Sequence, residues 1–131
     1  IGRSDRIMVS LHLEECSLPL KRAAPLGLIL NELLINSLKY AFPGGRKGKI
    51  RISLEKGEET LLLKVADDGI GLPSGAYPPD PSASSLGLRL VELLAHQIDA
   101  QIIVEASAGS CFSILLQNKV VPLQNNGFSP S

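Results

Sequence analysis

The sequence predicts an α+β fold, a two-layer sandwich in which helices cover one face of a mixed, largely antiparallel sheet. Apolar residues recur at helical spacing over 25–42 and 86–98. Short apolar or alternating runs predict strands at 7–13, 49–56, 60–66, 101–106 and 110–117. The connections around 57–58 and 108–109 have the length of hairpin loops, which makes most of the strand pairs antiparallel.

Length and composition fit one compact domain, which we place at 1–117, followed by a flexible tail at 118–131. With 131 residues and 44% hydrophobic content, the chain can bury a core without disulfides or metals. A formal net charge of zero argues against nucleic acid as a partner, and no apolar run approaches membrane-spanning length, so we expect no direct membrane contact. Cys16 and Cys111 stand far apart without a secretory signal, so we expect reduced thiols and a cytoplasmic location.

The first polar motif, NELLINSLKY at 31–40, lies on the predicted helix 25–42. Glu32, Asn36 and Tyr40 follow at steps of four, and Lys39 lies three beyond Asn36, so these side chains share one helix face. An amide oxygen can bind Mg, a carboxylate can orient or deprotonate a nucleophile, and a lysine can neutralise phosphate. A solvated helix face is the alternative, which the surrounding leucines disfavour because they predict a largely buried helix.

The second motif, DDGIG at 67–71, follows the apolar strand 60–66. Asp67 at the strand end can accept a hydrogen bond from an exocyclic amine. Gly69 and Gly71 permit positive φ and the close approach of a flat ring, a combination that fits adenine. A plain Asp-Gly turn is the alternative, and the position of the motif after the Asn-containing helix favours a nucleotide site.

The third motif, SSLGLRLVELLA at 84–95, predicts a helix that begins at a serine cap. Free backbone amides near Leu86, Gly87 and Leu88, together with the helix dipole, can receive phosphate groups. A capped helix start is common by itself. Its place behind the first two motifs makes it a candidate phosphate site.

In this order the three motifs resemble the N, G1 and G2 boxes of the ATP-binding domain of two-component sensor histidine kinases, in the GHKL superfamily of ATPases. The resemblance covers residues 7–117 and implies a Bergerat-type fold that binds ATP and Mg. It implies that Glu32 is the catalytic base or positioning group and that Asn36 binds Mg. Lys39 would contact phosphate, and Tyr40 would lie near the nucleotide.

The resemblance extends to the other motifs. It implies that Asp67 receives the adenine amino group, that Gly69 and Gly71 shape the floor of the pocket, and that the amides around Gly87 meet the phosphates. Ser110 falls in a weaker box where many relatives carry threonine, and could contribute its hydroxyl. Two departures are the single glycine of the third motif and a lid segment, 72–84, that has no phenylalanine.

The resemblance further implies transfer of the γ-phosphate to a histidine on a separate dimerisation and phosphoacceptor domain, with a response regulator downstream. Neither His12, in a strand pattern, nor His96, near a helix end, is expected to be the acceptor. Kinases of this family usually dimerise through the helices of that separate domain, so the resemblance implies a monomer. Because the acceptor histidine lies on the other domain, we expect the chain to bind ATP with little turnover. Three alternatives stay open: a serine kinase of the anti-sigma-factor type, an inert nucleotide-binding module, and a plain interaction domain in which Asp67 caps a turn.

Overall fold

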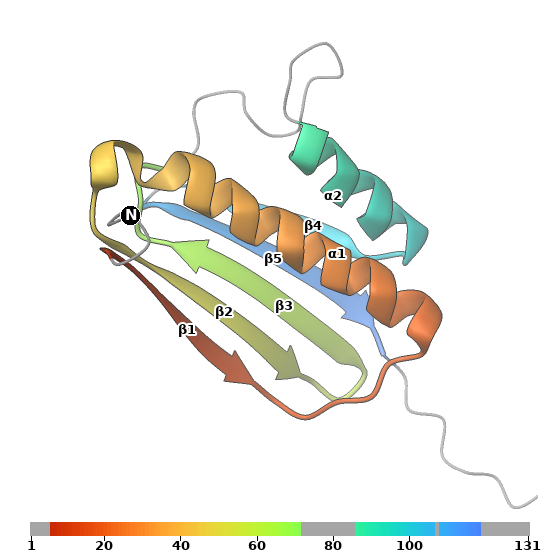
Figure 1. The fold of residues 1–131 in the computed structure, drawn as a ribbon. Coiled ribbons are helices and arrows are strands. Elements are labelled where there is room, and N and C mark those ends of the chain that lie inside the picture. Colours follow the sequence, from red (N-terminus) through yellow and green to blue (C-terminus); the bar gives the residue numbers. More distant parts are fainter. Residues whose placement is uncertain (1–5, 72–85, 107, 119–131) are drawn as a thin grey trace, which may run out of the picture.

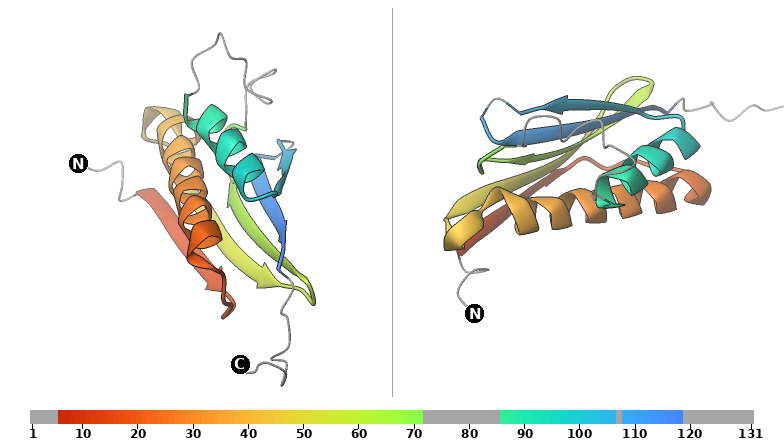
Figure 2. Two further views of the ribbon diagram at one scale, coloured as in Figure 1. Left: turned by 90° about the vertical axis from the view of Figure 1, so that its right-hand side faces the viewer. Right: turned by 90° about the horizontal axis from the view of Figure 1, so that it is seen from above.

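The computed structural model describes residues 6–71, 86–106 and 108–118. It has two layers, a five-stranded sheet and a helical layer (Figure 1). The turned views show that both long helices lie on the same face of the sheet (Figure 2). The predicted α+β sandwich is confirmed.

The strands lie in the order β1-β2-β3-β5-β4. Their bounds are β1 Ile7–Leu13, β2 Gly48–Lys56, β3 Thr60–Asp67, β4 Gln101–Glu105 and β5 Ser110–Gln117. β1 pairs with β2 in parallel, whereas the remaining pairs are antiparallel. No predicted strand end differs from these bounds by more than one residue. In β3 buried and half-buried positions alternate, which is the two-residue period of a strand with one face in the core and makes that strand easy to recognise.

The helical layer consists of α1 (Leu20–Asn36) and α2 (Leu86–Gln97), with a π-helical turn, η2 (Ser37–Ala41), directly after α1 and a short turn, η3 (Pro43–Gly45), after that. The prediction of one helix over 25–42 was wrong at its start, and it did not include the change to π geometry in the last turn, which ends at Ala41. The carbonyl of Pro19 accepts the first amide hydrogen bonds of α1, so the helix begins before residue 25. It loses α geometry at η2, and π turns of this kind are frequent at functional sites.

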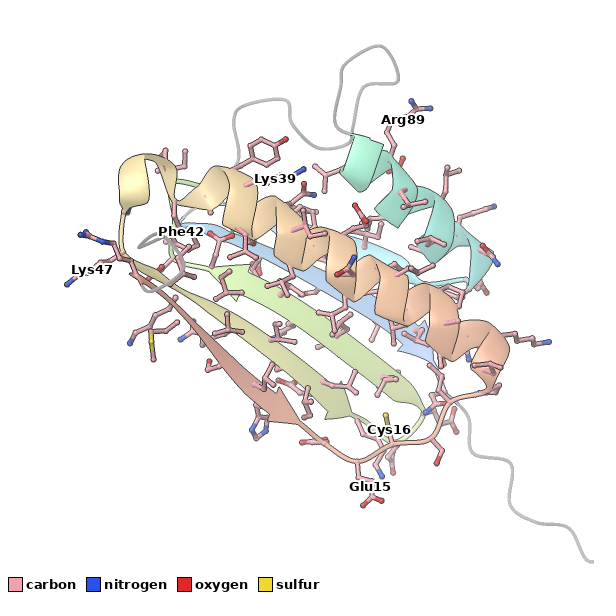
Figure 3. The ribbon with its side chains drawn as sticks, in the orientation of Figure 1. Glu15, Cys16, Lys39, Phe42, Lys47 and Arg89 are labelled. Atoms are coloured by element: carbon pink, nitrogen blue, oxygen red, sulfur yellow. The ribbon has the colours of Figure 1, made fainter. Side chains whose placement is uncertain are left out.

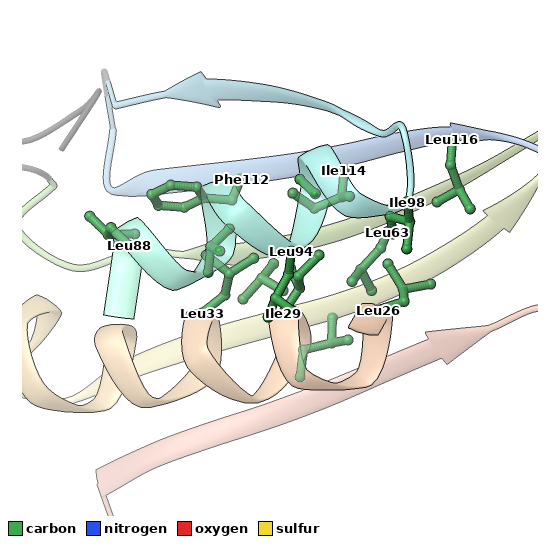
Figure 4. Packing of buried hydrophobic residues seen from close by; sticks show 14 of the residues in the cluster. Leu26, Ile29, Leu33, Leu63, Leu88, Leu94, Ile98, Phe112, Ile114 and Leu116 are labelled. Carbon is green, nitrogen blue, oxygen red and sulfur yellow. The ribbon is translucent and has the colours of Figure 1, made fainter. Parts of the chain in front are cut away.

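The hydrophobic core lies between the two helices and the sheet (Figure 4). Ile29 of α1, Val91 of α2, Ile50 of β2 and Ile114 of β5 are each 0% exposed. Complete burial of such a side chain stabilises the fold by about 1.5–3 kcal/mol. This core holds α1 and α2 antiparallel to each other, so that the end of α1 and the start of α2 lie at the same end of the molecule (Figure 1).

Candidate functional site

Asp67 ends β3 inside the protein and has an exposed fraction of 7%. Its Oδ2 accepts hydrogen bonds from the hydroxyls of Ser37, at 2.9 Å, and Ser110, at 2.7 Å. Its Oδ1 accepts from the amides of Gly69, at 3.0 Å, and Ser110, at 3.3 Å. A carboxylate offers about four lone-pair positions. The donors around Asp67 therefore fill the hydrogen-bonding capacity of this carboxylate and fix its orientation.

Two different structural features bring the hydroxyl donors to Asp67. Ser110 begins β5 and is the register partner of Asp67 in the antiparallel ladder. Ser37 begins the π turn η2 and is buried. The predicted hydroxyl of Ser110 is thus at the site, whereas the sequence reasoning missed Ser37. Its position four residues after the buried Leu33, on the inner side of the helix, was the available signal.

The glycines next to Asp67 allow parts of the protein backbone to approach one another. A Cβ on Gly69 would overlap the carbonyl oxygen of Ala41, and the amide of Ile70 donates a hydrogen bond of 3.0 Å to that oxygen. The predicted positive φ holds for Gly71, at 82°, but Gly69 does not have one. Gly109 has a φ of 90°, and a Cβ there would overlap the Asp67 carbonyl oxygen.

The start of α2 lies against the polar side of α1. A Cβ on Gly87 would be 2.9 Å from Oε1 of Glu32, 3.5 Å from Oδ1 of Asn36 and 3.6 Å from Nδ2 of Asn36. The structure therefore brings together the predicted catalytic carboxylate, the predicted metal ligand and the predicted phosphate-binding turn. Nδ2 of Asn36 is buried and has no hydrogen-bond partner among the described residues.

Lys39 and Tyr40 lie in η2, beyond the α-helical part of the motif. Their alignment with Glu32 and Asn36 was predicted from α-helical steps, and this geometry ends at Asn36. Tyr40 is 64% exposed, and Lys39 projects from the end of the helical layer at which α2 begins (Figure 3). Both side chains are therefore accessible to a ligand.

Leu88 packs its side chain into the core, with 5% exposed, so only its backbone could serve a ligand. Leu86 begins α2, and its amide and that of Gly87 belong to the first helical turn, where amides have no partner within the helix. The predicted lid at 72–84, the serine cap of α2 and all of the predicted tail except residue 118 lie outside the described residues.

The side chains of the site suit a metal that is held mainly by the phosphates of a bound substrate and only in part by the protein. Within the described ranges, no group of three or more His, Cys, Asp or Glu side chains could hold a metal ion. Glu32 and Asn36 supply one carboxylate and one amide oxygen, and Mg²⁺ is commonly bound by few protein groups together with substrate phosphates. In the described part of the chain, no helix is both long and apolar enough to cross a membrane.

The chain is similar to known histidine kinases. It is 32% identical over 98 residues to blue-light-activated histidine kinase 2 of Erythrobacter litoralis, which covers 73% of this chain and 28% of that protein. It is 35% identical over 83 residues to the sensor histidine kinase PdtaS of Mycobacterium tuberculosis, covering 62% of this chain and 16% of that protein. The chain thus spans less than a third of either curated relative.

A solved structure agrees with these relatives. The histidine kinase domain of the blue-light-activated histidine kinase EL346 from Erythrobacter litoralis superimposes with a TM-score of 0.76 at 27% identity, over 85% of this chain and 51% of that one. The sequence model of the histidine kinase-, DNA gyrase B- and HSP90-like ATPases matches residues 21–120. This match includes α1 except its first residue, and all of η2, the DDGIG motif, α2 and β5. The chain therefore belongs to the family of histidine kinase-, DNA gyrase B- and HSP90-like ATPases.

Proposed function

We propose that this chain binds Mg-ATP, with adenine at Asp67 and the phosphates between α1 and the start of α2. The observation that carries the proposal is the placement of two consecutive residues. Ser37 donates its hydroxyl to Asp67, while the amide group of Asn36 lies next to Gly87. The end of α1 therefore joins a buried acceptor for a base to a helix N-terminus suited to anions.

The hydroxyls of Ser37 and Ser110 allow Asp67 to accept the adenine amino group although its oxygens are already occupied. A hydroxyl can rotate, and it can accept a hydrogen bond as well as donate one. When an exocyclic amine donates to Oδ2 of Asp67, one hydroxyl can turn away and contact a ring nitrogen instead. The backbone amides of Gly69 and Ser110 still hold Oδ1 in place.

The carboxylate of Glu32 makes a cation necessary at the end of the site where we place the phosphates. Phosphate groups beside Gly87 would lie near this negative charge, and like charges at short range repel each other. A bound Mg²⁺ supplies the compensating charge. The amide oxygen of Asn36 is the protein ligand that we assign to it. Glu32 is then placed to orient the reacting group, and Lys39 to neutralise phosphate.

For the whole protein we propose a sensor histidine kinase. The chain would supply the γ-phosphate to a histidine on a separate dimerisation and phosphoacceptor domain, and a response regulator would receive it next. The named histidine kinases to which the chain is similar support this role. In phosphoryl transfer a protein mainly positions groups and neutralises charge, so the chain alone should bind ATP with little turnover.

Calorimetric titration with a non-hydrolysable ATP analogue tests the site. We expect binding with Mg²⁺ and weaker binding with EDTA. Asn36→Ala should reduce the difference between these two conditions, whereas Asn31→Ala, an exposed position on the same helix, should leave it unchanged. Absence of binding by the folded wild-type chain would refute the proposal and favour an interaction domain.

Phosphotransfer separates the proposed activity from the other nucleotide-binding alternatives. The chain is incubated with radiolabelled Mg-ATP and a separately produced helical phosphoacceptor domain of a related histidine kinase. Acid-labile, base-stable label on that domain, lost with Glu32→Ala, is expected for histidine phosphorylation. Acid-stable label would indicate serine phosphorylation, and binding without any label would indicate an inert module.

A further inference from the structure

The edge strand β1 leaves apolar side chains uncovered on the face of the sheet that elsewhere forms the core. Val9 and Leu11 are the register partners of Ile50 and Ile52 in β2. Ile50 and Ile52 are 0% and 4% exposed, whereas Val9 and Leu11 are 47% and 63% exposed. Leu13, further along β1, is 59% exposed. Apolar positions of the core face therefore continue to the edge of the sheet, but the helical cover does not.

β1 also lacks the features that usually protect an edge strand from pairing. It is the outermost strand (Figure 1), and its sequence, IMVSLHL, contains no proline, lysine, arginine or acidic residue. Edge strands are commonly protected by such residues or by short length. The opposite edge, β4, is shorter and ends in Glu105. Among the described strands, only β2 pairs with β1, so the backbone groups on the outer side of β1 are available to another strand.

The two ends of β1 carry opposite charge. Arg6 precedes the strand and lies beside Lys47, because Ile7 is the register partner of Gly48. Glu14 and Glu15 follow the strand, and all four charged side chains are exposed. Figure 3 shows Lys47 and Glu15 at opposite ends of this edge.

The sequence led us to expect a monomer, but the uncovered edge strand favours association. We propose that β1 pairs with β1 of a second copy of this chain, antiparallel and about a two-fold axis at Ser10. An isologous pairing of this kind is self-complementary. Centred on Ser10, it sets Arg6 opposite Glu14 of the other copy and Val9 opposite Leu11 of the other copy. The uncovered apolar side chains then contact each other on one face, and the basic end of each edge meets the acidic end of the other.

The register follows from the side-chain pattern. A slip by one residue would pair the apolar side chains with residues whose side chains lie on the other face of the sheet. A slip by two residues would keep the faces but separate Arg6 from Glu14. The resulting dimer joins two five-stranded sheets into one, and roughly eight to ten backbone hydrogen bonds would form across the new strand pair. Asp67 lies on β3, which β2 separates from this edge, so the proposed nucleotide site stays open.

Sedimentation equilibrium of the full chain tests the association. We expect a mass of twice 14.0 kDa at high protein concentration and a lower apparent mass at high salt, because salt screens exposed charge pairs. Leu11→Lys should weaken dimerisation at least about tenfold, which corresponds to about 1.4 kcal/mol. Leu93→Lys, on α2 and 65% exposed, is the matched control and should leave it unchanged. A folded wild-type chain that stays monomeric at every concentration overturns the proposal.

Disulfide cross-linking tests the register. In a background with Cys16→Ser and Cys111→Ser, Ser10→Cys places two thiols opposite each other at the two-fold axis, so oxidation should yield a covalent dimer. His12→Cys is the control, because its partner across the pair would be Met8. More cross-linking through residue 12 than through residue 10 would exclude this register.

Charge reversal tests the pairing of the strand ends. Arg6→Glu should weaken the dimer, and adding Glu14→Arg should restore it. Because Oε1 of Glu14 accepts a hydrogen bond of 2.8 Å from the amide of Lys56, thermal unfolding of each variant controls for lost stability. If the double variant, still folded, associates no better than the single Arg6→Glu variant, the proposed pairing of the ends is wrong.

Discussion

The hydroxyl of Ser37 donates a hydrogen bond of 2.9 Å to Oδ2 of Asp67 and thereby ties the π turn after α1 to the end of β3. Ser37 directly follows Asn36, whose side chain lies beside Gly87 of α2. One short segment of α1 and η2 thus contacts both the sheet and the second helix. A change at either contact should therefore affect the proposed nucleotide site.

Ser37→Ala should lower the free energy of unfolding by about 1 kcal/mol, because Oδ2 of Asp67 loses one of its two hydroxyl donors. It should also weaken binding of the ATP analogue, since the remaining hydroxyl must then serve both the carboxylate and the base. Urea unfolding and calorimetry measure the two effects. Ser17→Ala, at an exposed position, should change neither of them.

Asp67→Asn should lower the free energy of unfolding by about 1–3 kcal/mol. Both oxygens of Asp67 accept hydrogen bonds, so the NH₂ group of the new amide would face a donor whichever way the side chain turns. The ratio of ATP affinity to GTP affinity should fall, since an amide NH₂ repels the adenine amino group. Asp68→Asn is the matched control: Asp68 is exposed and accepts a bond of 2.7 Å from the Lys49 amide, which an amide oxygen can still accept. An unchanged nucleotide preference in Asp67→Asn would place the base elsewhere.

Gly87→Ala should weaken nucleotide binding several-fold with little effect on stability. The new Cβ would lie 2.9 Å from Oε1 of Glu32, so that carboxylate must move, and it belongs to a side chain that can rotate. Gly27→Ala in α1 meets no described atom within 4 Å and should raise the free energy of unfolding by about 0.5–1 kcal/mol without altering binding. Equal binding by both variants would argue against the proposed phosphate end.

Gly109→Ala should destabilise the protein more than Gly45→Ala. Both glycines have positive φ, at 90° and 74°, which costs a residue with a side chain about 1–3 kcal/mol. A Cβ on Gly109 would also overlap the carbonyl oxygen of Asp67, whereas a Cβ on Gly45 meets no described atom within 4 Å. The difference between the two unfolding free energies therefore measures the close contact at Asp67. A difference near zero would mean that the backbone there can shift easily.

Local patterns predicted much of the fold and part of the site. The alternation in β3 and the helical spacing in α2 are short-range signals, so both elements were found nearly to the residue. The start of α1 was missed because the predicted helix began at Pro25, a residue type that favours the first helical turn, and Pro25 lies inside α1. The π turn was missed because the spacing argument assumed α-helical geometry throughout. The turn is recognised only by the contacts that it makes, here those of Ser37 and Ala41 with the end of β3 and the turn after it.

The sequence by itself determined the fold class, the strands, most of the helical residues and the chemical groups of the candidate site, because these depend on residue type and short-range periodicity. The tertiary structure decided which of those groups meet. It brought Ser37 and Ser110 to the same oxygen of Asp67, Glu32 to Gly87, and the apolar side chains of β1 to an edge that neither α1 nor α2 covers. Such contacts join residues far apart in the chain, and they follow from how the helices and strands pack rather than from any local pattern.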